Sequence, residues 1–223
     1  MPNLSILRLS NDHTDGIAVG KPTPQFFVAD NDYALGRLVE AVSNSPYWKD
    51  TAIFVVEDDA QDGPDHVDAH RSPALVISAY NRSGLLIHDF HNTVSMIRTI
   101  ELLLGIQPMN QLDATATPMN IFQAAVDLKP YQASLPNISI DNTMTPPARD
   151  AATALWIQRT EEQDLSHADM ADPQTLNQII WFSIRARTPM PAIARLPIFD
   201  AMRLGLTEVR EELARKDKAR DPD

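Results

Sequence analysis

Six acidic residues and two histidines lie within sixteen residues of this chain, between Val55 and His70. Carboxylate oxygens bind hard divalent cations and imidazole nitrogens bind transition metals, so the mixture is typical of a site for a transition metal or a mixed set of metals. A calcium-binding EF-hand loop is excluded, because a loop that starts at Asp58 would carry Ala69 at its twelfth position, where a glutamate is required. The stretch therefore predicts a divalent-metal site. Its candidate ligands are Asp58 and Asp59, and then His70, with Asp65 and His66 as secondary candidates.

The element in front of this stretch determines where the carboxylates lie. Thr51–Val56 is rich in β-branched and aromatic residues and is too short for a helix, which predicts a buried strand. Asp58 and Asp59 would then lie at the carboxyl end of a strand, where open parallel α/β sheets form their ligand crevices. A solvated turn is the ordinary interpretation of two neighbouring aspartates, but it is disfavoured here because unpaired carboxylates are costly beside a buried strand. A ligand role is favoured over a surface role for His70, and the two roles are equally supported for His66.

A second polar cluster follows another apolar segment near the start of the chain. Leu4–Leu9 is predicted to be a strand, and the polar residues behind it include Asp12 and His13. Two strand ends therefore carry groups that can bind a metal. His88 and His91 precede a predicted helix, and we interpret them as structural.

Strands and helices alternate through the first half of the chain. We expect a loop over Gly20–Gln25, which contains two prolines, and a helix over Asp30–Ser45. A buried strand at Ala74–Ser78 and a helix at Thr93–Leu104 follow, with Gly105 as the C-terminal cap of that helix. This order predicts an α/β fold, in which a layered sheet is flanked by helices and is at least partly parallel.

Composition divides the chain into three parts. Residues 1–125 form the predicted α/β core. Residues 126–150 contain several prolines and few periodic stretches, which indicates an extended segment that lies over the core or links onward. Residues 151–223 form a predicted helical C-terminal extension. Its expected helical segments are Ala151–Gln163, Asp172–Arg185 and the amphipathic Ile198–Ala214.

Charge and residue usage exclude some classes of partner. The net charge is -11, which disfavours nucleic acid because phosphates require basic surfaces. We expect no membrane span and find no signal-peptide pattern at the start of the chain. The absence of cysteine leaves the redox compartment open.

Four segments together resemble the phosphoesterase branch of the alkaline phosphatase superfamily, which includes bacterial phospholipases C and acid phosphatases. They are Asn11–Thr14, Val56–Asp59, Asp65–His70 and Met96–Gly105. The resemblance covers roughly residues 3–122. It implies a sheet flanked by helices and the hydrolysis of phosphate esters at a divalent-metal centre.

The same resemblance implies roles for individual residues. Asp58 and Asp59 match the acidic pair that binds metal at a strand end. Asp12 and His13 match a segment that supplies a metal ligand or a phosphate contact, so we assign Asp12 to the metal and His13 to catalysis. His70 matches a later histidine that serves a second metal. The implied cofactor is a divalent metal (Mn, Zn, Ca or Mg), and the implied substrate is a phosphate-ester small molecule or a lipid head group.

One departure from the family pattern is large. Enzymes of this branch carry an acidic ligand and a Ser or Thr nucleophile upstream of the segment that matches Asp12, whereas this chain starts just ahead of it. Thr14 has no nucleophile role in the family motif. We therefore expect the carboxyl-terminal part of a longer enzyme, with an alkaline phosphatase-like sheet that lacks its N-terminal strands. An uncovered sheet edge of this kind is a template for pairing and predicts a homo-oligomer.

These observations lead to two functional hypotheses. The first is a metal-dependent phosphoesterase, or the C-terminal part of one. The second is a non-catalytic, truncated phosphoesterase-like domain that retains metal or anion binding or acts in assembly. A metal-dependent hydrolase of other esters, such as sulfates, would share the ligands. The cellular compartment is undetermined, although a periplasmic or secreted location would suit a full-length relative.

Overall fold

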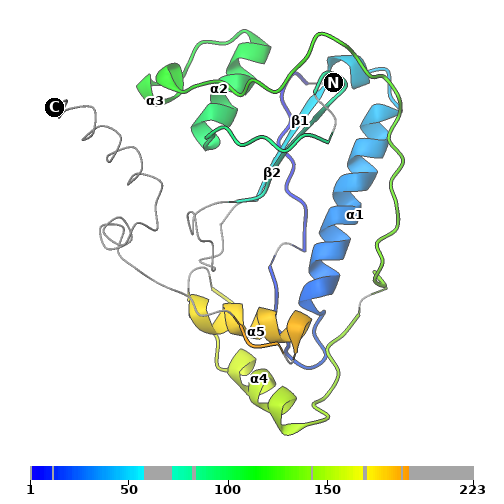
Figure 1. Cartoon of the computed structure of the whole chain (residues 1–223), viewed down its shortest axis with the longest axis vertical. Helices are drawn as coiled ribbons and strands as arrows, with labels where there is room; N and C mark the ends of the chain where they lie inside the picture. The colour runs from blue at the N-terminus through cyan, green and yellow to red at the C-terminus, as the bar shows by residue number, and fades with distance from the viewer. Residues whose placement is uncertain are drawn as a thin grey trace, which may run out of the picture.

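The computed structural model describes residues 2–11, 13–57, 72–81, 84–141, 143–167, 170–186 and 188–190. Five α-helices and one two-stranded sheet form within these residues (Figure 1). In chain order the elements are α1 (Pro24–Ser43), the 3-10 helix η1 (Trp48–Asp50), β1 (Ala52–Val56), β2 (Ala74–Ser78), α2 (Thr93–Leu104), α3 (Gln111–Thr115), α4 (Ala151–Glu161) and α5 (Pro173–Arg185). The mixture of helices and strands is compatible with the predicted α/β class. No described helix is both long and apolar enough to cross a membrane.

The two strands pair in an antiparallel register, so the expected parallel pairing is wrong for the described part of the chain. Val56 pairs with Ala74 at one end of the ladder, and Ala52 pairs with Ser78 at the other. Short apolar runs indicate strands but carry no information on strand direction, because both orientations bury the same residues. The strands are also less buried than predicted, since Val56 is 42% exposed and Leu75 is 51% exposed.

The strand predicted at Leu4–Leu9 does not form. These residues make no ladder in the described structure, and three of their four apolar side chains are exposed: Leu4, Leu7 and Ile6, the last at 92%. A strand needs a neighbouring strand to receive its hydrogen bonds, so an alternating sequence alone is insufficient.

Helix α1 begins six residues before its predicted start. The side chain of Thr23 caps it by accepting a hydrogen bond from the N–H of Phe26, and Pro24 occupies the first turn. Proline is well suited to this position, because the N–H that it lacks has no partner within the helix. The prediction of a loop over Gly20–Gln25 is therefore wrong at its C-terminal end.

Helices α2, α4 and α5 lie where the sequence predicted them, whereas α3 was not predicted. Helix α2 has the predicted bounds, with Asn92 as its N-cap and Gly105 in the left-handed conformation (φ 67°) as its C-cap. Helices α4 and α5 each begin after a capping aspartate and end within two residues of the predicted ends. The amphipathic segment Ile198–Ala214 lies outside the described residues.

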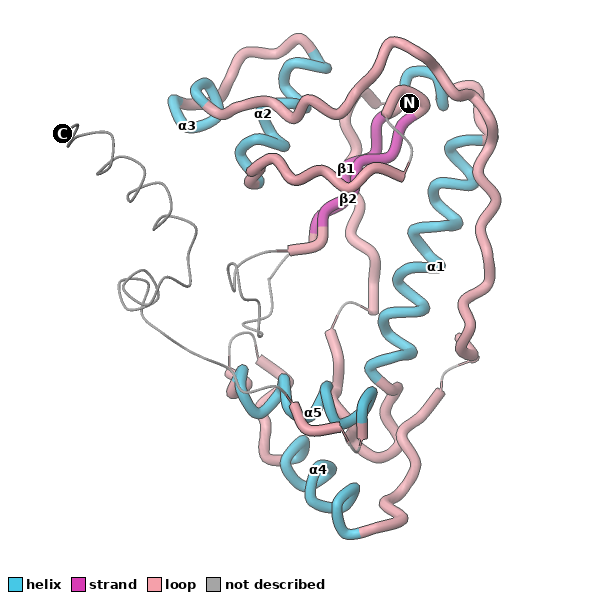
Figure 2. The backbone as a smooth tube through the Cα atoms, in the orientation of Figure 1, coloured by secondary structure: helices cyan, strands magenta, loops and turns pink. Residues whose placement is uncertain are grey.

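The proline-rich segment, residues 126–150, lies along α1 (Figure 2). The N–H of Tyr131 donates to Ser43 Oγ (2.8 Å), and the N–H of Ala133 donates to Glu40 Oε1 (3.4 Å). Farther on, the backbone of Thr145 exchanges hydrogen bonds with Gly20 and Lys21 at 3.0 and 2.8 Å.

A small apolar cluster joins the N-terminal loop to the C-terminal helices. Its buried members are Ile17, Ile157 and Ile179, with Trp156 stacked on Phe182 beside them. Gly16 enables the close approach of the loop to α4. Its φ is +60°, and a Cβ on it would lie 2.7 Å from Cγ2 of the buried Thr160.

We predict that Gly16→Ala lowers the free energy of unfolding by about 2–4 kcal/mol. About 1–2 kcal/mol comes from the left-handed backbone, and the remainder comes from the collision with Thr160. The measurement is urea denaturation followed by circular dichroism. Gly20→Ala is the matched control, because its φ is +76° and a Cβ there would have no neighbour within 4 Å. Equal losses in the two variants would contradict the packing of the loop against α4.

Candidate functional site

The sheet brings together the two ends of the acidic segment. The N–H of Glu57 donates to the carbonyl of Pro73 (3.2 Å), immediately beyond the last ladder pair, Val56 and Ala74. Residues 58–71, which connect these positions, therefore begin and end at the same point of the sheet. Asp58, Asp59, Asp65, His66 and His70 lie in this connection and outside the described residues. Their assignment as ligands stays a prediction.

Asp12 also lies outside the described residues. Hydrogen bonds hold the described residues on both sides of it. Asn11 has a positive φ of 63°, and its side-chain amide donates to Asp30 Oδ2 on α1 (2.8 Å). His13 follows and is exposed. Thr14 Oγ1 then accepts a hydrogen bond from the N–H of Gly16 (3.0 Å), which fixes the turn that leads into the apolar cluster. His13 is thus held on a segment anchored at both of its ends.

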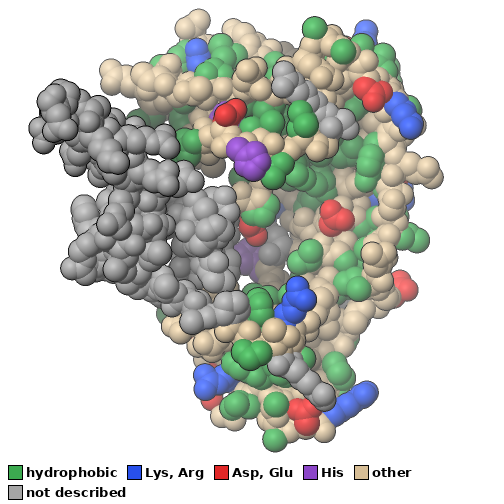
Figure 3. All heavy atoms as spheres, viewed as in Figure 1, with side chains coloured by type: hydrophobic (Ala, Val, Ile, Leu, Met, Phe, Trp, Pro, Cys, Tyr) green, Lys and Arg blue, Asp and Glu red, His purple; other side chains and the backbone are tan. Residues whose placement is uncertain are grey.

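The described part of the chain includes two cavities of interest. The larger one, of about 610 Å³, lies between α1, β2 and the proline-rich segment. Its apolar walls include Leu35, Val39 and Leu75, and Asp32 and Tyr33 provide polar groups. Because Leu75 lies next to Ala74, this groove reaches the end of the sheet where residues 58–71 begin and end. Figure 3 shows the molecule hollowed on one face, with histidine and acidic side chains inside the hollow.

The described residues alone contain no group of three or more Asp, Glu or His side chains that could hold a metal ion. His88 is exposed, and the ring nitrogens of the half-buried His91 are enclosed and have no hydrogen-bond partner among the described residues. The donor chemistry of Asp12, Asp58, Asp59 and His70 fits a divalent cation, because it combines carboxylate oxygens with an imidazole nitrogen.

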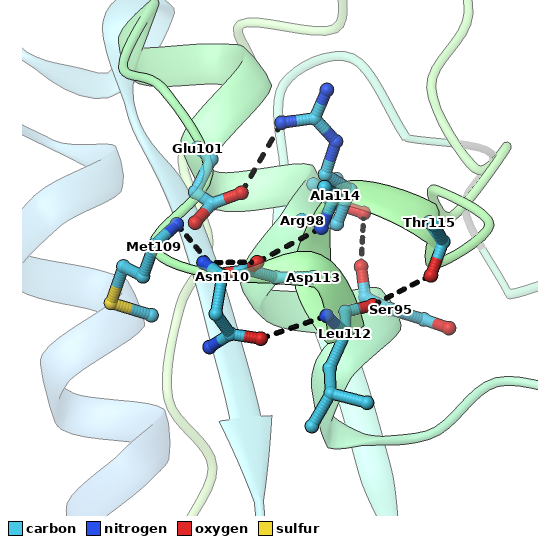
Figure 4. A network of polar contacts seen from close by, with 10 residues as sticks. Ser95, Arg98, Glu101, Met109, Asn110, Leu112, Asp113, Ala114 and Thr115 are labelled. Atoms are coloured by element: carbon cyan, nitrogen blue, oxygen red, sulfur yellow. Dashed lines mark hydrogen bonds and ion pairs between the residues drawn. The ribbon is translucent and has the colours of Figure 1, made fainter.

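A buried ion pair on α2 was not anticipated from the sequence (Figure 4). Arg98 Nη1 lies 3.2 Å from Glu101 Oε2, and the Glu101 side chain is only 3% exposed. Between these two residues in the sequence, the buried Thr99 donates to the carbonyl of Ser95 and accepts a hydrogen bond from the N–H of Met119. These contacts give a structural role to the segment Met96–Gly105, which carries part of the family resemblance.

Asp113 on α3 completes this network. It is 2% exposed, and its carboxylate accepts hydrogen bonds of 2.9 Å from the N–H groups of Met109, Asn110 and Ala114. Burial raises the pKa of Asp113, but the hydrogen bonds from the N–H groups of Asn110, Met109 and Ala114 outweigh this effect, so the pKa lies below its usual value. The spacing of Asn110 and Asp113 is that of a capping box, which was the available sequence signal.

Asp164, Ser166 and His167 also meet, yet their geometry does not match a catalytic triad. Ser166 Oγ and Asp164 Oδ2 both lie 3.0 Å from the same histidine nitrogen, Nδ1. A triad requires the hydroxyl at one ring nitrogen and the carboxylate at the other. The hydroxyl of Ser166, its N–H and the His167 side chain lower the pKa of Asp164, as expected for a polar turn. This turn borders the smaller cavity, of about 350 Å³.

Comparison with known proteins identifies one family. Residues 23–107 match the family described as Phosphoesterase family. This region contains α1, β1, β2 and α2, together with the whole acidic connection between the strands. No curated protein and no solved structure matches the chain. The match supports a phosphoesterase family for this region, and the narrower superfamily resemblance stays a prediction.

We predict that Asp113→Asn destabilises the chain at neutral pH and flattens its acid denaturation. The lowered pKa means that the ionised carboxylate stabilises the fold above the unfolded-state pKa of about 4, and that this stabilisation is lost as pH falls through the lower, folded-state pKa. Urea denaturation curves measured between pH 3 and 7 test this prediction. The range extends from about one unit below to three units above the unfolded-state pKa. The exposed Asp141→Asn is the control, and an identical pH profile for Asp113→Asn and the parent chain would refute the assignment.

We also predict that Ser166→Ala leaves the hydrolysis of aryl phosphates and of carboxylic esters unchanged. Ser166 and Asp164 both contact Nδ1 of His167, so the ring is not placed between the hydroxyl and the carboxylate as a catalytic triad requires. Initial rates for both substrate types, compared with those of the parent chain, provide the check. A fall of more than about tenfold, or about 1.4 kcal/mol in barrier height, would show that this turn takes part in chemistry.

Proposed function

We propose that this chain hydrolyses phosphate esters at a divalent-metal centre whose ligands include Asp58 and Asp59. The observation that carries the proposal is the match of residues 23–107 to a phosphoesterase family, because that region includes the acidic connection. The sheet supports it, since Glu57 and Pro73 fix both ends of the connection beside one another. A phosphoesterase acts on phosphate esters, and here the substrate would be a small phosphate ester or a lipid head group.

The proposed ligands divide into two sets. Asp58, Asp59 and Asp12 would bind a metal directly behind β1, and His70 would serve a second metal. Asp65 and His66 are further donors in the same connection. When bound, a divalent metal would neutralise charge on the phosphoryl oxygens and lower the pKa of an attacking hydroxyl. The metal would be manganese, zinc, magnesium or calcium.

His13 would contact the phosphate or move a proton at the reacting oxygen. Its exposure leaves it accessible to substrate, and the hydrogen bond between Asn11 and Asp30 restricts the loop that carries it. Thr14 is not proposed as the nucleophile, because its hydroxyl oxygen accepts a hydrogen bond from Gly16 in the turn. No nucleophile is assigned within the described residues.

We predict metal-dependent hydrolysis of an aryl phosphate by the parent chain and its loss in Asp58→Ala/Asp59→Ala. Changes to groups that only orient metal ligands typically cost about 10- to 100-fold, so removal of two ligands should cost at least about 100-fold. Initial rates are measured with each of the four metals and after chelation. Asp50→Ala is the matched control, because Asp50 is exposed and lies at the opposite end of β1.

A melting scan with each metal separates the two functional hypotheses. A metal concentration of 100 times the dissociation constant stabilises a protein by about 2.7 kcal/mol, so binding without turnover is readily detected. Metal-dependent stabilisation with no turnover in any condition would refute the enzyme and leave a binding domain. Unchanged turnover in the double alanine variant would refute the ligand assignment.

A further inference from the structure

The ladder determines which backbone groups of β1 face away from β2. In an antiparallel pair, hydrogen-bonded residue pairs alternate with pairs that make no backbone hydrogen bonds to each other. The hydrogen bond from Glu57 to Pro73 fixes the phase of this alternation, so Val55 and Ile53 also point toward β2. The N–H and C=O groups of Ala52, Phe54 and Val56 therefore point to the other side of β1.

The opposite edge of the sheet, along β2, is capped at its Ser78 end. Asn81 Oδ1 accepts a hydrogen bond from the N–H of Ser78 (3.0 Å), and its Nδ2 donates to the carbonyl of Val76. The side chain of Asn81 thus takes the place of a neighbouring strand at this edge. Beyond β2, the carbonyls of Ala79 and Tyr80 accept hydrogen bonds from Asp127 and Gln123, both at 2.7 Å.

The free edge of β1 is open in the described part of the chain. The outward groups of Ala52, Phe54 and Val56 have no backbone partner among the described residues. Figure 2 shows no described strand beside β1 other than β2. Because the β2 edge is partly capped, the edge of β1 is the more complete template for an extended strand.

We propose that the free edge of β1 pairs with the same edge of a second copy of this chain, around a two-fold axis at Phe54. In this antiparallel arrangement Phe54 lies opposite Phe54 of the second copy, and Ala52 lies opposite Val56 of the second copy. Each of these three residue pairs exchanges two hydrogen bonds, which gives about six across the axis. The outward N–H and C=O groups of Ala52, Phe54 and Val56 then all have hydrogen-bond partners. The edge is therefore complementary to itself, as a two-fold interface requires.

Side chains near the axis support a second copy as the partner. Phe54 already contacts Phe122 edge to face, with ring centroids 6.5 Å apart, and cross-strand pairing would add the Phe54 ring of the second copy on the same face. The antiparallel direction also brings the exposed Lys49 of each copy toward Glu57 at the other end of the partner strand. The net charge of -11 on each copy opposes association, so the dimer should strengthen as salt screens that repulsion.

Hydrogen exchange of single amides in the full chain, measured at several protein concentrations, tests the pairing directly. The amides of Ile53 and Val55 point toward β2 and should be protected at every concentration. The amides of Ala52, Phe54 and Val56 should become protected only as the concentration rises, in step with a monomer–dimer transition measured by sedimentation. Both effects should move to lower concentration at higher salt.

A pair of proline variants provides the matched control. Ala52→Pro/Val56→Pro removes outward donors only, and the extended conformation of Thr51 (φ -120°, ψ 134°) is compatible with a following proline. By symmetry this variant loses four of about six intermolecular hydrogen bonds and should be monomeric, with Ile53 and Val55 still protected. Ala74→Pro/Val76→Pro removes outward donors from the β2 edge and should dimerise like the parent chain.

Three results would overturn the proposal. One is a monomer at all concentrations and salt levels. Another is protection of Ala52, Phe54 and Val56 that does not depend on concentration, which would mean that a segment of the same chain covers the edge. The third is a dimer in which these amides stay unprotected, or which survives Ala52→Pro/Val56→Pro, since a different surface would then hold the copies together.

Discussion

The register of the two strands is the constraint on which the functional part of the molecule depends. It places Glu57 against Pro73 and so brings together both ends of the connection that carries Asp58 and Asp59. The same register turns Leu75 and Ile77 toward the groove beside α1. It also turns the N–H and C=O groups of every second residue of β1 away from β2. The register sets both the side-chain faces and the hydrogen-bond directions, because both alternate from one residue to the next.

The remainder of the chain holds this sheet in place through polar contacts more than through a large core. The proline-rich segment is hydrogen-bonded along α1, and Thr99 on α2 accepts a hydrogen bond from the N–H of Met119, which lies beyond α3. The apolar cluster around Ile179 lies at the other end of α1, where α5 contacts that helix. Many large apolar side chains stay exposed, among them Ile6 and Phe90, so the described sheet and helices do not cover one another fully.

Local signals in the sequence predicted the helices well, because caps and periodicity act within a few residues. Asn92 and Gly105 bound α2 where they were expected, whereas the start of α1 was missed because Pro24 was taken as a helix breaker rather than a first-turn residue. Strand direction and the absence of a strand at Leu4–Leu9 depend on distant partners that no local pattern specifies. The residue types of the candidate site were apparent from the sequence, and the family match covers Asp58 and Asp59 but not His13.

The central claim is that the donors between β1 and β2 hold a divalent metal at the end of the sheet. The most direct measurement is a titration with Mn²⁺ followed by paramagnetic broadening of backbone amide signals in the full chain. The account predicts that the signals of Glu57, Ala74 and His13 broaden first and that Asp58→Ala/Asp59→Ala abolishes the effect. Selective broadening around Asp164 instead, or broadening at Glu57 that persists in the double variant, would contradict it.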